Sequence, residues 1–95
     1  MSAPIAWLAS AAADLDRILD HIERDSPQGA RRVAMAIRKG ANTLLHEQPL
    51  AGRMGRVEGT RELVISSTPY ILVYRLRKER VEVLRIMHGN QKWPP

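Results

Sequence analysis

Basic side chains in the second half of the chain are the groups that could bind an anionic partner. Residues 51–95 hold nine Lys or Arg and four Asp or Glu, whereas residues 1–50 hold six of each kind, so the net charge of +5 comes from the second half. The excess begins in a Gly/Arg sequence at residues 52–56. Arg53 and Arg56 could contact phosphate or an acidic protein surface. The alternative is a solvated loop whose glycines serve turns.

Further candidates lie in the strand-like segments and in the tail. Arg61 could reach a partner, whereas Glu62 points to the opposite face of the same strand and favours a surface or helix-facing ion pair. Arg85 lies among apolar neighbours, which is typical of a paired structural arginine. His88 could act as a base or could hydrogen-bond the tail that follows it. Trp93 could pack back on the fold or protrude as an interface anchor.

Composition restricts the kinds of site that the chain can build. It has no cysteine, which excludes disulfides and thiolate metal sites and fits a cytoplasmic location. His21, His46 and His88 show no metal-ligand spacing, so we expect no metal and no cofactor. No segment approaches the ~20 apolar residues of a membrane span, so we expect no membrane partner. The length fits a single domain, residues 1–95.

The first half must supply the scaffold. Residues 4–7 are a short apolar run that predicts a strand, and Ser10 could cap the helix that follows. That helix has apolar positions at helical spacing: Leu15, Ile18, Leu19 and Ile22. Ser26 and Pro27 predict the N-cap and first turn of a second helix, which must lie antiparallel to the first because the connection is short. Its predicted buried positions are Ala30, Val33, Ala34, Ile37, Ala41, Leu44 and Leu45.

The second half alternates between turns and strand-like runs. Residues 50–60 contain three glycines and predict a loop. Residues 61–65, 70–76 and 81–87 are β-rich runs with short turns between them, which predicts an antiparallel meander. The order β-α-α-β-β-β predicts an α+β fold, with a helical hairpin packed on a small antiparallel sheet. We find no helix that combines a basic face with capped, groove-reading geometry, which argues against a generic DNA-binding role.

An ordered series of motifs spans nearly the whole chain. The series is Trp7, Asp14-Leu15, Ile18, Pro27, Leu44, Pro49, Gly52-Arg53, Gly55-Arg56-Val57, Gly59 through Val64, Pro69 through Arg75, Ile86 through Gly89, and Trp93-Pro94. It resembles the ParE/RelE superfamily, the toxins of bacterial type II toxin–antitoxin (plasmid stabilisation) modules. The resemblance implies the same helical hairpin on a small sheet. It also implies a hetero-oligomer with a cognate antitoxin, expected to be a ParD-like ribbon-helix-helix protein with an acidic tail.

The resemblance implies two kinds of target. ParE-like members are described as poisoning DNA gyrase, and RelE-like members cut mRNA at the ribosome. RelE-like nucleases place basic residues at alternate positions of one strand, add an arginine in the next strand, and end with Tyr or His-Tyr. Here Arg61 is followed at the alternate position by Leu63, Ile71 stands at the arginine position, and Gly89 follows His88. The resemblance therefore favours the ParE-like branch. A nuclease would keep only Arg61 and His88 as catalytic candidates.

Strand alternation gives these apolar replacements a meaning. If Arg61, Leu63, Ile71, Val73 and Arg75 share the sheet face away from the helices, that face is apolar with a basic rim, which is typical of a protein-binding surface. The antitoxin-binding candidates are therefore Leu63, Ile71, Val73 and Arg75. The target-binding candidates are Arg53, Arg56, Arg61, Arg75, His88, Lys92 and Trp93.

These patterns lead to one expectation and two alternatives. We expect a cytoplasmic toxin that binds DNA gyrase and is neutralised by its antitoxin. A ribosome-dependent mRNA endonuclease remains open, as does a degenerate, non-toxic member that keeps only antitoxin binding.

Overall fold

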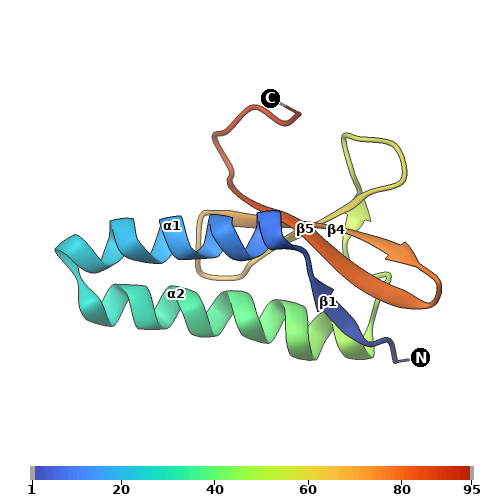
Figure 1. Cartoon of the computed structure of the whole chain (residues 1–95), viewed down its shortest axis with the longest axis horizontal. Helices are drawn as coiled ribbons and strands as arrows, with labels where there is room; N and C mark the ends of the chain where they lie inside the picture. Colours follow the sequence, from blue (N-terminus) through green and yellow to red (C-terminus); the bar gives the residue numbers. More distant parts are fainter. Residues whose placement is uncertain (1, 95) are drawn as a thin grey trace.

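The computed structural model describes residues 2–94, and Figure 1 shows a helical hairpin packed against a twisted sheet. The elements in chain order are β1 (Ile5–Trp7), α1 (Ala9–Asp25), α2 (Pro27–Lys39), the π-helical turn η1 (Gly40–Leu45), β2 (Arg53–Met54), β3 (Arg61–Val64), β4 (Tyr70–Arg77) and β5 (Arg80–His88). The α+β class and the order of the predicted elements are confirmed.

The two helix starts differ in how they are capped. Ser26 accepts a hydrogen bond at its Oγ from the Gly29 amide at 2.9 Å, and Pro27 occupies the first helical position, as predicted. The predicted cap at Ser10 is wrong, because α1 begins at Ala9 and Leu8 is its N-cap. Ser10 therefore lies inside the first turn, where its hydroxyl donates to the Leu84 carbonyl at 2.7 Å and fastens the helix to β5.

The second helix changes its winding before it ends. The turn Gly40–Leu45 is π-helical. Because a π-helix has more residues per turn than an α-helix, residues four apart stay on the buried face and residues seven apart turn away from it. Ile37, Ala41 and Leu45 are consequently buried completely. Leu44, which 3.6-residue spacing predicts to be buried, is 37% exposed instead.

The sheet is mixed, with five strands in the order β1-β5-β4-β3-β2. Strands β3, β4 and β5 form the predicted antiparallel meander. Two features extend the prediction. Strand β1 lies parallel to β5, and the segment expected to be only a loop contains β2, whose Arg53 pairs with Glu62.

The register between β3 and β4 decides which side chains face the helices. Arg61 pairs with Tyr74 and Leu63 pairs with Leu72. Leu63, Leu72 and Tyr74 belong to the core that also holds Ile37 of α2. The prediction that Arg61 and Leu63 lie on the face away from the helices is therefore wrong. Successive residues of a strand point to opposite faces, so a pairing assumed one residue out of phase moves the whole strand to the other face.

Ile71, Val73 and Arg75 alternate with Leu72 and Tyr74 along β4, so they do lie on the opposite face. That face is nevertheless not an exposed apolar surface, because Ile71 is 7% exposed and Val73 is fully buried. In Figure 1 the glycine-rich loop and the C-terminal tail both lie at the top of the molecule, and α2 lies at the bottom. Between Ser2 and Pro94, the helices fall short of the length and apolar character that crossing a bilayer requires.

Candidate functional site

Arg61 and Tyr74 fasten the segment between the helices and β2. Arg61 donates from Nη1 to the Gly52 carbonyl at 2.8 Å. The buried Tyr74 hydroxyl donates to the Pro49 carbonyl at 2.8 Å and accepts from the Gly52 amide at 2.9 Å. Burial raises the pKa of Tyr74, and the Gly52 hydrogen bond and the charge of Arg61 offset part of that rise. The Arg61 guanidinium is thus engaged with main-chain carbonyls of its own chain.

The glycines of the loop permit close packing. A Cβ on Gly52 would lie 2.7 Å from the Tyr74 ring, and a Cβ on Gly55 would lie 2.1 Å from Oγ1 of Thr60. Both positions therefore exclude a side chain unless Tyr74 or Thr60 moves. These two glycines serve packing.

Glu62 gathers the two arginines of the same loop. Its buried carboxylate lies 3.3 Å from Arg53 and 3.4 Å from Arg56, and it also accepts from the Arg56 amide at 3.0 Å. Burial alone raises the pKa of Glu62, but the hydrogen bonds from Arg56 and Arg53 and their positive charges outweigh it and leave the pKa below its ordinary value. Arg53 and Arg56 remain substantially exposed, so they can still contact a partner while they neutralise Glu62.

A second pair of arginines converges on Glu82 near the β4–β5 turn. Arg75 Nε lies 2.7 Å from one carboxylate oxygen and Arg80 lies 2.8 Å from the other. The hydrogen bonds from these two arginines lower the pKa of Glu82 and outweigh the effect of burial. Arg75, a candidate for both target and antitoxin binding, is therefore already part of an intramolecular ion-pair network.

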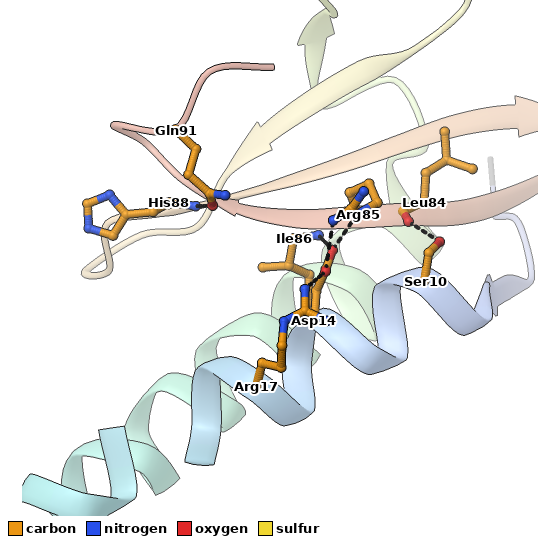
Figure 2. A network of polar contacts seen from close by, with 8 residues as sticks. All are labelled: Ser10, Asp14, Arg17, Leu84, Arg85, Ile86, His88 and Gln91. Carbon is orange, nitrogen blue, oxygen red and sulfur yellow. Dashed lines mark hydrogen bonds and ion pairs between the residues drawn. The ribbon is translucent and has the colours of Figure 1, made fainter. Parts of the chain in front are cut away.

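Asp14 of α1 receives three kinds of donor, as Figure 2 shows. Arg85 contacts it through Nε at 2.7 Å and Nη2 at 3.1 Å, the Ile86 amide donates at 2.9 Å, and Arg17 pairs with it from the next turn of the helix. Burial raises the pKa of Asp14, but the Arg85 and Ile86 hydrogen bonds outweigh that rise and leave the pKa below its ordinary value. The structural pairing predicted for Arg85 is confirmed. Its partner is not predictable from sequence, because Asp14 has the ordinary pattern of an acid near a helix start.

His88 and Trp93 hold the C-terminal tail. The His88 amide donates to the Gln91 side chain at 2.8 Å, and His88 Nδ1 accepts from the Asn90 amide at 3.1 Å. The Arg85 guanidinium lies 5.9 Å from the centre of the Trp93 ring, which is within cation–π distance. His88 thus anchors the tail and Trp93 packs back on the fold.

The two catalytic candidates lie at different positions along β4. Arg61 is opposite Tyr74, and His88 is opposite Tyr70 and meets its ring edge-on at 5.7 Å. Four residues of strand separate these positions by about 13 Å, at about 3.3 Å per residue. General acid–base chemistry at one phosphate needs both groups within hydrogen-bond reach of the reacting atoms. Arg61 and His88 are not brought together in this way.

An apolar groove lies beside the free edge of β3. It has a volume of about 420 Å³ and is lined by Ala36, Lys39, Gly40, Leu44, Leu63, Val64, Ile65, Ser66 and Ser67. Strand β2 covers only the Arg61 and Glu62 positions of β3. The Ile65 amide bonds to Tyr70 of β4, so the alternating main-chain groups of Val64 point to the open edge. Val64 is 54% exposed there.

Sequence patterns could have found only part of this groove. Leu44 is recognisable as an apolar position, but its exposure depends on the π-helical turn. Val64 carries a weaker signal, since it is an apolar residue that alternates with the buried Leu63 on a short strand.

The comparisons with known proteins agree on one family. The family model described as the ParE toxin of the type II toxin–antitoxin system parDE matches residues 5–93. The Y4kP protein of Sinorhizobium fredii is 43% identical over 90 residues, which span 95% of this chain and 92% of that protein. Toxin RelE2 of Caulobacter vibrioides is 36% identical over 87 residues, which span 92% of this chain and 96% of that protein. A chain of the chromosomal ParDE system from P. aeruginosa superposes with a TM-score of 0.79 at 29% identity, covering 92% of this chain and 96% of that one.

Proposed function

The chain belongs to the ParE toxin family of type II toxin–antitoxin systems, and from this premise we propose that it arrests growth by binding DNA gyrase rather than by cutting RNA. The observation that carries the proposal is the separation of Arg61 from His88 along β4. Arg61 is held by the Gly52 carbonyl, and His88 is held by the tail. Neither is positioned to share one scissile phosphate with the other.

The side chains at the two positions where RNA-cleaving relatives carry basic residues support the same proposal. Leu63 packs in the core beneath the helices, and Ile71 is buried on the other face. An RNA-cleaving site needs cations at such positions to stabilise the charge of the transition state. Apolar side chains cannot supply that charge.

The proposed target surface combines the tail with the glycine-rich loop. The tail contributes Lys92 and Trp93, and the loop contributes the exposed guanidinium groups of Arg53 and Arg56. Both segments lie at the top of the molecule in Figure 1. Trp93 rests on Arg85 and is only partly buried, and Trp and Arg are residue types enriched in interface hot spots. We assign His88 the role of holding the tail in place.

The antitoxin is proposed to bind the apolar groove beside β3. An extended segment placed next to Val64 would continue the line of β2 and pair with the free main-chain groups of that edge. Its apolar side chains would enter the groove lined by Leu44 and Leu63. Of the antitoxin candidates chosen from the sequence, Leu63 belongs to this groove. Ile71, Val73 and Arg75 do not line it.

A second candidate function is ribosome-dependent mRNA cleavage. The observation in its favour is the 36% identity to Toxin RelE2 of Caulobacter vibrioides. In that case Arg61 or His88 would have to leave its present hydrogen bonds when the chain binds the ribosome. A third candidate is a member that has lost toxicity and keeps the antitoxin groove.

Inducible expression in a bacterial host tests the proposal. We expect double-strand DNA breaks and an SOS response before any loss of mRNA. Deletion of residues 91–95 and the change Trp93→Ala should each relieve the growth arrest while circular dichroism shows a folded chain. Arg24→Gln, on the exposed side of α1, is the matched control and should leave the arrest unchanged. Codon-biased mRNA loss that precedes DNA damage would contradict the proposal.

A further inference from the structure

The basic residues of the two halves of the chain differ in whether they lie in ion pairs. Five of the nine basic residues in the second half contact a carboxylate: Arg53, Arg56, Arg75, Arg80 and Arg85. No Asp or Glu occurs between Asp25 and Glu47. Within residues 2–94, none of the basic side chains of α2 lies in an ion pair. Four cations without an ion pair therefore lie together on α2, in the half whose formal charge cancels by sequence.

The α2 cations surround one exposed apolar side chain. Arg31, Arg32, Arg38 and Lys39 are all exposed, and they stand four and three residues before, and three and four residues after, Met35. Residues three and four apart on a helix are surface neighbours. Met35 is 71% exposed. The five side chains therefore form one surface with an apolar centre and a cationic rim, which we call the Met35 surface.

This surface differs from an ordinary solvated helix face. Solvated helices usually mix charges of both signs, which stabilises them through pairs three or four residues apart. Within α2, every charged residue three or four positions from Met35 is positive, and the resulting repulsion costs the isolated helix stability. Met and Arg are both enriched where proteins meet. The helix that carries these cations is capped by Ser26.

We propose that the Met35 surface binds an acidic amphipathic helix of a protein partner. The matching helix carries an apolar residue with carboxylates three and four residues to either side, so that its apolar residue packs on Met35 and each carboxylate meets one cation. Two helices pack with their axes about 8–10 Å apart, a distance that the long Arg and Lys side chains span. The apolar centre favours a protein over nucleic acid, because phosphates would leave Met35 without a partner. The inference is independent of the proposed toxin target.

A synthetic helical peptide with the sequence Glu-Glu-Ala-Ala-Leu-Ala-Ala-Glu-Glu at its centre is a direct probe. Its binding to the purified full chain is measured by fluorescence anisotropy. Exposed ion pairs contribute about 0.2–1 kcal/mol each, so the double change Arg32→Gln/Lys39→Gln should weaken binding by about two- to thirtyfold. Met35→Ser should weaken it by about three- to tenfold. The control Arg77→Gln/Lys78→Gln removes the same charge from the β4–β5 turn and should change affinity by less than about twofold.

The outcomes separate docking from general charge attraction. A peptide with Gln in place of the four Glu should fail to bind. The proposal would be overturned in favour of non-specific attraction if the control pair weakened peptide binding equally, or if Met35→Ser left the affinity unchanged. Duplex DNA is tested as a competitor. If it displaces the peptide and binds the Met35→Ser variant as tightly as the unchanged chain, the proposal would be overturned in favour of nucleic acid.

Discussion

Arg85 of β5 and Asp14 of α1, 71 residues apart in sequence, form a two-point ion pair with N–O distances of 2.7 and 3.1 Å. Because Arg85 also lies over Trp93, this pair joins the first helix, the last strand and the C-terminal tail. The Ile86 amide shares the same carboxylate. One buried acid thus stabilises three parts of the fold.

Removal of that acid should be costly. Asp14→Ala leaves Arg85 and the Ile86 amide without an acceptor, and we expect a loss of about 2–4 kcal/mol in the free energy of unfolding, measured with urea. Asp14→Asn keeps an acceptor for Ile86 and should lose less. The matched control is Asp16→Ala, at an exposed position of the same helix, which should stay within about 0.5 kcal/mol. Equal stability of Asp14→Ala and Asp16→Ala would contradict this role.

Acid should destabilise the fold through three carboxylates. Asp14, Glu62 and Glu82 each have a pKa below the ordinary value of 3.8 or 4.5. A lowered folded-state pKa contributes stability that is present above the unfolded value and is lost as the pH falls through the folded value. We therefore expect the urea midpoint to fall once the pH drops below about 4.5. Glu62→Gln or Asp14→Asn should flatten the decline, and a midpoint that rises on acidification would show that the sign is wrong.

The Tyr74 hydroxyl should contribute more than that of Tyr70. Tyr74→Phe leaves the Gly52 amide and the Pro49 carbonyl without their partner, which should cost about 1–3 kcal/mol in urea unfolding. Tyr70 has no hydroxyl hydrogen bond within residues 2–94, so Tyr70→Phe is a control for the loss of a phenol. Similar losses for the two variants would mean that the contact of Tyr74 with the loop contributes little.

A charge in the groove should separate neutralisation from toxicity. We expect Val64→Glu to weaken rescue by the cognate antitoxin while growth arrest persists, because an antitoxin strand paired along the open edge of β3 would bury the new carboxylate. Leu76→Glu places the same charge on another exposed apolar residue and should leave rescue intact. Co-expression growth curves measure both. Full rescue of Val64→Glu would place the antitoxin elsewhere.

The sequence predicts the order of the elements because their signals are local. Helical spacing around Leu15, the Ser26–Pro27 start, and the alternation in β4 each depend on a few neighbouring residues. Strand β2 escapes such reasoning, since two residues between glycines become a strand only through pairing with Arg61 and Glu62. The cap at Ser10 fails for a similar reason: the hydroxyl bonds to Leu84, which is 74 residues away.

The candidate site depends even more on long-range pairing. The sequence identifies the basic residues, but not which of them are neutralised by Glu62, Glu82 and Asp14. It also does not fix the phase of β3 against β4, which places Leu63 under the helices. Leu44 gains its surface position from the π-helical turn that ends the second helix. These features require the register and the packing of the whole fold.

The most direct test adds the purified chain to two reconstituted systems. One contains translating ribosomes with a defined mRNA, and the other contains DNA gyrase with plasmid DNA. The separation of Arg61 and His88 predicts intact mRNA on the ribosomes, together with gyrase inhibition or gyrase-dependent DNA breaks. Cleaved mRNA on translating ribosomes, with gyrase unaffected, would contradict it.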